Sequence, residues 1–166
     1  LSKVNGIYWK DSEGRIVRNR AHRQRFSLDE LPFASESFED LVTENLRGLI
    51  KRKRIVPIAT SRGCPYNCSF CSSKIIYPGG VKFRSPENVV EEIESQYKEG
   101  KRFFYLIDDT FTYNRRRAER IADIVLERRL DIKWVAVTRA DHLDRHLLEK
   151  FKRAGLERIL FGVESG

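Results

Sequence analysis

The stretch TSRGCPYNCSFCSSK, residues 60–74, contains every cysteine of the chain. Cys64, Cys68 and Cys71 follow the spacing CxxxCxxC, and no fourth cysteine is present to complete a tetrahedral set. The same stretch contains proline, asparagine and several serines, so it is a polar loop, where inert buried cysteines are rare. Three thiols so close together predict a group that the loop holds from one side.

Several kinds of site use clustered thiols. A disulfide framework needs paired cysteines in a secreted chain, and neither condition is indicated. A structural zinc site normally has four ligands, and His22, His142 and His146 lie at spacings that match no zinc finger or ribbon. A distant histidine nevertheless stays open as a zinc ligand. A single catalytic cysteine would leave its two neighbours without a role.

An iron–sulfur cluster fits the three thiols better. Three thiolates bind three irons of a cubane and leave one iron for a small ligand, much as a catalytic zinc site keeps one position open. Gly63 permits a tight backbone, while Arg62 and Lys74 can offset the negative charge of cluster and thiolates. The open iron is therefore the expected position of a bound ligand.

From residue 55 onward the chain alternates between apolar strands and amphipathic helices. Strands are predicted at IVPIAT (55–60), RFFYLI (102–107), IKWVAVT (132–138) and RILFG (158–162). Helices are predicted over residues 85–100, from Asn114 onward and over 144–154, with Ser85, Asn114 and Asp144 as N-caps. This order is typical of βαβ units around a parallel sheet, so we expect an α/β fold.

Polar residues follow each predicted strand. They are the three cysteines, the pair Asp108–Asp109, the run Arg139–Asp141 and the pair Glu164–Ser165. Because the carboxyl ends of parallel strands share one edge, where barrels and open α/β sheets bind ligands, we expect these loops to meet at one site. His142 and His146 have the i, i+4 spacing of helical metal ligands, but they straddle a helix start and are predicted to be surface residues.

The first 54 residues have a different texture. VNGIYW and RIVRN flank the polar turn KDSEG and predict a β-hairpin, and FEDLVTENLRGLI (38–50) has the apolar spacing of a short helix. We expect residues 1–54 to be a hairpin and linker at the tail of a preceding domain, and residues 55–166 to be part of a core domain. The chain begins with leucine and contains no methionine, which suggests a piece of a longer protein.

Composition and charge narrow the classes of function. The chain has 166 residues, 40% hydrophobic and 34% charged, with no membrane-spanning apolar run and no signal-peptide layout. A cytoplasmic protein is therefore expected. The net charge is +8, but the basic runs KRKR (51–54) and RRRAER (115–120) are interleaved with acidic residues. We interpret them as solvated surface, with RNA binding as the weaker interpretation.

The segment CPYNCSFC resembles the CxxxCx(aromatic)C signature of the radical S-adenosylmethionine (SAM) superfamily. The wider run TSRGCPYNCSFC resembles the branch that follows a cobalamin-binding domain, and also methylthiotransferases. LDELPF at 28–33 resembles the linker of that branch. The resemblance implies a parallel (βα) partial barrel, truncated after about its fourth strand, with any cobalamin domain lying before Leu1.

The resemblance also implies roles for individual residues. Cys64, Cys68 and Cys71 would ligate a 4Fe–4S cluster, and the amino and carboxylate groups of SAM would chelate its open iron. Phe70 would lie near the adenine. Asp108–Asp109 stands where many members have glycine–glycine–glutamate, although either aspartate could instead cap the following turn. Arg139, Glu164 and Ser165 would contact the SAM carboxylate and ribose, with a structural ion pair as the alternative for Arg139.

The implied function is reductive cleavage of SAM to a deoxyadenosyl radical, for methyl transfer, oxidative cyclisation or sulfur insertion on an unknown substrate. The expected partners are SAM, that substrate and an electron donor such as flavodoxin or ferredoxin. The alternative is a non-catalytic zinc- or cluster-binding module that recognises RNA or a protein.

Overall fold

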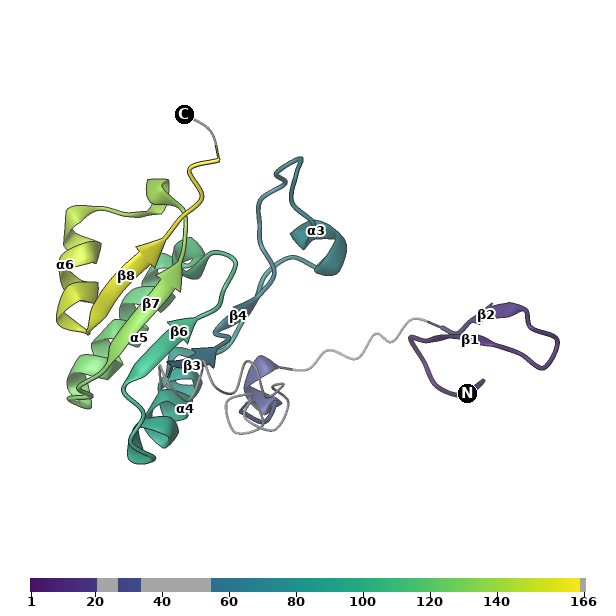
Figure 1. The fold of residues 1–166 in the computed structure, drawn as a ribbon, viewed down its shortest axis with the longest axis horizontal. Coiled ribbons are helices and arrows are strands. Elements are labelled where there is room, and N and C mark those ends of the chain that lie inside the picture. Colours follow the sequence, from purple (N-terminus) through teal and green to yellow (C-terminus); the bar gives the residue numbers. More distant parts are fainter. Residues whose placement is uncertain (21–26, 34–54, 165–166) are drawn as a thin grey trace.

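The computed structural model describes residues 1–20, 27–33 and 55–164. Its core is one parallel four-stranded sheet in the spatial order β3-β6-β7-β8, which is also the chain order (Figure 1). The strands are β3 (Ile55–Ile58), β6 (Phe103–Leu106), β7 (Lys133–Val137) and β8 (Leu156–Leu160). The expected α/β fold with consecutive parallel strands, as in part of a (βα) barrel, is confirmed.

Three helices alternate with these strands and pack on one another in chain order over one face of the sheet (Figure 1). They are α4 (Pro86–Lys98), α5 (Arg115–Glu127) and α6 (Arg145–Arg153). Each begins at its predicted N-cap, because the side chains of Ser85, Asn114 and Asp144 accept a hydrogen bond from the backbone N–H three residues later. No helix in the described part of the chain is long and apolar enough to cross a membrane.

The core between the sheet and the helices contains both aliphatic and aromatic side chains. Phe111, Trp134 and Phe151 form an aromatic cluster with ring centroids 5.3–5.9 Å apart. The Trp134 indole N–H donates to the carbonyl of Ala154 at 2.9 Å, so the buried ring keeps its polar atom satisfied. This packing fixes β7 against α6, and with it the loop that follows β7.

A small antiparallel pair that the sequence did not predict carries the cysteine loop. It consists of β4 (Ser61–Arg62) and β5 (Lys82–Phe83), with the short helix α3 (Ser73–Ile76) between them. Figure 1 shows this segment extending away from the sheet beyond the end of β3. Two-residue strands are too short to show a period-2 pattern, so the sequence alone gives no signal for them.

The amino-terminal residues contain the predicted hairpin, β1 (Tyr8–Lys10) paired with β2 (Ile16–Arg18). The segment that resembles a linker forms the 3₁₀ turn η1 (Leu28–Glu30), where Leu28 is buried. The Asp29 carboxylate accepts the Ser85 backbone N–H at 2.9 Å, which joins η1 to the start of α4. The helix predicted within residues 38–50 lies outside the described residues. Two further 3₁₀ turns are η2 (Phe111–Tyr113) and η3 (Ala140–His142).

Candidate functional site

A cavity of about 530 Å³ lies where the loops after β3, β6, β7 and β8 meet. It contains most of the residues predicted for a site, although they are spread over a hundred positions of the sequence. The predicted residues that line it are Cys64, Cys68, Phe70, Cys71, Asp109, Arg139 and Glu164. Its other walls are Tyr66, Thr110, Val137, Thr138, Ala140, Asp141 and Gly162. The structure therefore places the cysteine loop opposite the ends of the neighbouring strands.

The cysteine loop folds back on itself through its own backbone. Cys71 N–H donates to the Cys68 carbonyl at 3.1 Å, and the Ser73 N–H points at the Cys71 sulfur at 3.5 Å. The Cys64 sulfur lies 3.7 Å from the Thr110 hydroxyl of the loop after β6. All three cysteines are free thiols, Cys64 and Cys68 partly buried and Cys71 exposed. They are thus accessible to a group bound in the cavity.

Gly63 allows the loop to leave β4 at a sharp angle. Its φ of +93° lies in the left-handed region, and a Cβ at this position would lie 2.7 Å from the Gly80 carbonyl oxygen. Both the backbone conformation and the close approach exclude other residues without a local rearrangement. The chain before the first cysteine therefore packs directly on the returning strand.

The three thiols can serve two kinds of metal group. A zinc ion requires its sulfur ligands about 2.3 Å from a single point. A cluster attaches each thiolate to a different iron, so the sulfurs can lie further apart. Within the described residues, the structure shows no group of three or more His, Cys, Asp or Glu side chains placed to hold a single metal ion.

Asp108 is not among the residues that line the cavity, and its predicted contact with a ligand stays a prediction. Its side chain is 2% exposed, and Oδ1 accepts the backbone N–H groups of Thr60 and Ser61 at 2.7 and 2.9 Å. Oδ2 accepts the Thr60 hydroxyl. Because both carboxylate oxygens are engaged inside the protein, Asp108 joins the end of β6 to the start of the cysteine segment.

Arg117 lies behind this junction and carries a buried charge. Its Nη2 donates to the Thr60 carbonyl at 2.6 Å and its Nε to the Arg84 carbonyl at 2.7 Å. Burial lowers the pKa of Arg117 to about 10, while the nearby Asp108 carboxylate opposes this shift. The guanidinium thus stays charged at neutral pH. Asp108 and Arg117 together fix Thr60 from two sides.

Asp109 points the other way from Asp108 and remains a candidate contact. Its side chain is exposed at the cavity, and its Oδ2 accepts the Ser73 hydroxyl at 2.8 Å. That bond joins the loop after β6 to the first residue of α3. Because the described residues donate one hydrogen bond to this carboxylate, it keeps acceptor capacity toward the cavity.

Arg139 is held at the cavity by two kinds of contact. Its Nε and Nη2 donate to the two carboxylate oxygens of Asp141 at 3.0 and 2.8 Å. These hydrogen bonds raise the pKa of Arg139 and lower the pKa of Asp141. The guanidinium also lies 4.3 Å from the centre of the Tyr66 ring. The ion pair that sequence reasoning offered as an alternative is present, and Arg139 lines the cavity as well.

Tyr66 and His142 were not expected at the site, and the structure brings them together. The Tyr66 hydroxyl lies 2.5 Å from His142 Nε2, and burial raises the pKa of the phenol. His142 is half-buried, so the prediction of a surface residue is wrong for it, whereas His146 is exposed as predicted. Tyr66 and His142 are 76 positions apart, and no local pattern could have paired them.

Phe70 and Glu164 complete the predicted set as far as the structure describes it. Phe70 lines the cavity and is 71% exposed as a residue, so it is accessible to a ligand. Glu164 also lines the cavity and has a φ of +63°, an uncommon backbone conformation for a residue with a side chain. Ser165 lies outside the described residues.

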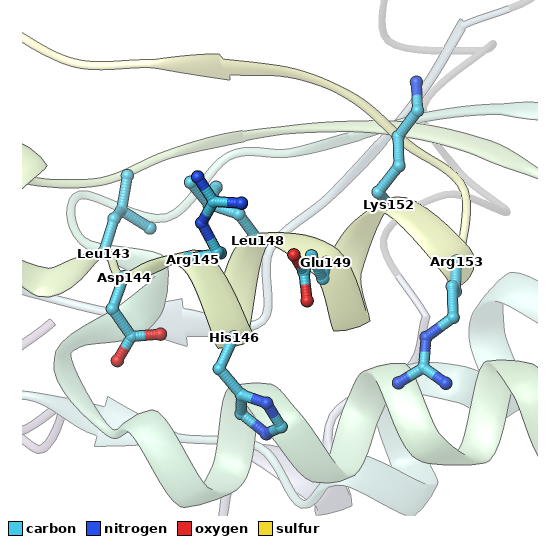
Figure 2. A pocket seen from close by; sticks show the side chains of 8 residues that line it. All are labelled: Leu143, Asp144, Arg145, His146, Leu148, Glu149, Lys152 and Arg153. Atoms are coloured by element: carbon cyan, nitrogen blue, oxygen red, sulfur yellow. The ribbon is translucent and has the colours of Figure 1, made fainter.

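A larger hollow of about 1140 Å³ runs along the outer side of α6 (Figure 2). It is lined by Leu143, Asp144, Arg145, His146, Leu148, Glu149, Lys152 and Arg153. The lining side chains extend along the helix from its first turn to its last. The hollow and the cysteine cavity have no lining residue in common. It contains none of the predicted site residues, so its size does not make it the functional site.

Comparison with known proteins agrees with the geometry. Residues 58–166 match the family model of the Radical SAM superfamily. The chain is 32% identical to an uncharacterized methyltransferase of Pyrococcus horikoshii over 99% of its length and 35% of that protein. It is 30% identical to the anaerobic magnesium-protoporphyrin IX monomethyl ester cyclase of Rubrivivax gelatinosus over 98% of its length and 29% of that protein. The chain thus spans about a third of the length of these curated relatives.

A solved structure shares the fold. The radical SAM methyltransferase TsrM from Kitasatospora setae aligns with a TM-score of 0.71 at 19% identity, over 98% of this chain and 33% of that chain. One structure of TsrM contains a tryptophan substrate and a SAM analogue, and another contains cobalamin and a [4Fe–4S] cluster. At this identity the likeness concerns the fold.

Proposed function

The chain belongs to the radical SAM superfamily, and we propose that its cysteine cavity holds a 4Fe–4S cluster that binds SAM. Cys64, Cys68 and Cys71 would be the cluster ligands, with one iron left for the amino and carboxylate groups of SAM. The observation that carries this proposal is that the three thiols line a cavity of about 530 Å³ together with Arg139 and Glu164.

When bound, the reduced cluster supplies the electron that splits SAM to a deoxyadenosyl radical. The residues of this chain bind and orient the SAM molecule. The Arg139 guanidinium suits the SAM carboxylate, since its charged N–H groups recognise carboxylates in a fixed plane. Asp109 and Glu164 offer acceptors for the SAM ammonium group or the ribose hydroxyls. Phe70 presents an exposed ring on which the adenine can stack.

Asp108 has a positioning role in this proposal. The loop with the three cysteines begins at Thr60 and Ser61. The backbone N–H groups of both residues donate hydrogen bonds to the Asp108 carboxylate. Since no fourth protein thiolate fixes the cluster, the direction in which the loop leaves the sheet determines where the open iron faces. A buried anchor at that point holds this direction.

The proposed class of reaction is inferred from the reactions that the relatives' names state. They include a methyltransferase, an anaerobic ester cyclase and a putative methylthiotransferase. We propose methyl transfer or oxidative cyclisation on an unknown substrate, with sulfur insertion as a further possibility. An external one-electron donor of the flavodoxin or ferredoxin type would reduce the cluster, and cobalamin would bind in a domain outside this chain. A reducing cytoplasm suits free thiols of this kind.

Anaerobic reconstitution with iron and sulfide tests the proposal. We expect the wild-type protein to hold four irons and four sulfides per chain, and its spectrum to change when SAM is added. Cys68→Ala should lose the cluster, while Ser69→Ala, an exposed neighbour in the same loop, should keep it. Zinc without sulfide in the wild type, or a full cluster in Cys68→Ala, would contradict the assignment and favour a binding module.

A further inference from the structure

We propose that Tyr66 and His142 form a clasp that fixes the middle of the cysteine loop to the loop after β7 and so positions Arg139 for SAM. This inference rests on the proposed function, because it concerns the same cavity. The clasp is the contact between the Tyr66 hydroxyl and His142 Nε2.

The clasp joins two segments that lie 76 positions apart in the sequence. Tyr66 lies between Cys64 and Cys68, in a loop without regular structure, and His142 ends the turn η3. Their polar atoms lie 2.5 Å apart in a half-buried environment. A hydrogen bond there is shielded from water more than one at the surface, so its loss leaves polar groups without a partner.

The clasp continues into the sheet through two buried threonines. His142 Nδ1 lies 3.3 Å from the Thr112 hydroxyl, and Thr112 is hydrogen-bonded to the hydroxyl of Thr138. Thr112 and Thr138 are 3% and 4% exposed. A neutral phenol that donates to Nε2 leaves Nδ1–H to donate to Thr112, and the Thr112 hydroxyl to donate to Thr138. Each polar atom in the row then has a partner, which fixes the plane of the imidazole.

The same arrangement controls the position of Arg139. The Tyr66 ring centre lies 4.3 Å from the Arg139 guanidinium. The Asp141 carboxylate accepts two hydrogen bonds from the same guanidinium. Asp141 precedes His142 directly, so the clasp restrains both contacts of Arg139 at once. If Tyr66 moves with a free loop, the guanidinium loses its ring contact and the cavity wall widens.

Tyr66 is therefore a positioning residue, distinct from the cluster ligands beside it. The side chains around it favour a fixed ring: Tyr113 packs against it edge-on at 6.4 Å between centroids, and His142 at 5.8 Å. The clasp holds the loop at its midpoint, whereas Asp108 holds it at its root. The two anchors act on different parts of the loop and have no residue in common.

The test measures SAM binding and cluster content separately in the reconstituted full-length protein. Tyr66→Phe removes the clasp but keeps the ring under Arg139, whereas Tyr66→Leu removes both. We expect normal iron and sulfide content in each variant. We expect the Kd for SAM to rise about fivefold in Tyr66→Phe, the loss of about one net hydrogen bond, and further in Tyr66→Leu. His142→Ala should weaken SAM binding at least as much as Tyr66→Phe, because it also removes the contact with Thr112. His142→Gln, which can still reach the phenol, should recover part of the affinity.

Two controls and a double-mutant cycle separate positioning from general destabilisation. Tyr113→Phe and His146→Ala change a neighbouring tyrosine and an exposed histidine, and should leave SAM binding unchanged. Tyr66→Phe combined with His142→Ala should weaken SAM binding no more than His142→Ala alone, because the Tyr66–His142 contact is already lost in that variant. Additive losses, or wild-type affinity in Tyr66→Phe, would overturn the clasp. A wild-type protein without a cluster would instead overturn the proposed function.

Discussion

Replacement of Asp108 by alanine should cost more stability than replacement of any exposed acid at the site. The carboxylate accepts three hydrogen bonds, from two backbone N–H groups and one hydroxyl, at a position that is 2% exposed. Each buried donor left without an acceptor costs about 1–2 kcal/mol, so Asp108→Ala should lower the free energy of unfolding by about 3–6 kcal/mol. That loss is comparable to the whole stability of a marginal domain.

The asparagine variant makes this prediction sharper. Both backbone N–H groups donate to Oδ1, and only the Thr60 hydroxyl donates to Oδ2. The amide of Asp108→Asn can keep its oxygen at the first position and donate from nitrogen to the Thr60 oxygen. This variant then keeps the hydrogen bonds and loses only the negative charge of Asp108, which interacts with the buried Arg117 guanidinium. We expect Asp108→Asn to cost about 1–2 kcal/mol, the difference between charged and neutral hydrogen bonds.

Urea unfolding of the protein without cluster measures both values. Transitions followed by circular dichroism should give lower midpoints at an unchanged m-value for the two Asp108 variants. The matched control is Asp109→Asn, because its exposed carboxylate accepts the Ser73 hydroxyl and should change stability by about 0.5 kcal/mol or less. Equal losses at the two adjacent aspartates, or no difference between the alanine and asparagine variants, would refute the anchor.

Two further changes test the loop entry and an ion pair. Gly63→Ala puts a Cβ 2.7 Å from a carbonyl oxygen at a φ of +93°. This change should lower the free energy of unfolding by about 1–3 kcal/mol and reduce the cluster content. Gly79→Ala, where a Cβ meets open space, should do neither, and equal iron content in the two variants would contradict this prediction. Hydrogen bonding to Arg115 lowers the pKa of Asp144 to about 2, so this pair stabilises the fold above about pH 4 and the contribution disappears as the pH falls toward 2. Asp144→Asn should therefore be less stable than wild type at pH 6 and equal to it near pH 2 in urea unfolding; a difference that does not change with pH would exclude the ion pair as its cause.

Local signals explain why most of the fold was predictable. An N-cap side chain accepts a hydrogen bond from a backbone N–H only three residues later, so the signal for a helix start is local in the sequence. Ser85, Asn114 and Asp144 could therefore be identified as N-caps from the sequence. The alternation of strands and helices likewise predicted that polar loops meet at one sheet edge. The β4–β5 pair escaped prediction because its two-residue strands are too short to carry a periodic pattern.

The roles of the two aspartates could have been separated from the sequence by continuing the period of the strand. In β6 and beyond, burial alternates through Phe104, Leu106, Asp108 and Thr110. Because side chains alternate between the two faces of a strand, the same period sends Asp108 inward and Asp109 outward. The resemblance to a ligand-binding motif treated the two residues alike, and the strand geometry distinguishes them.

The Tyr66–His142 contact had no such signal, because its partners lie in different loops, 76 positions apart. A ligand set with an open iron has no fourth protein bond, so the direction of the cysteine loop depends on contacts made outside the ligands. In this structure the sheet provides the direction through Asp108 at the root of the loop and through His142 at its midpoint. The proposed metal ligands are thus local in the sequence, while the residues that position them belong to the rest of the fold.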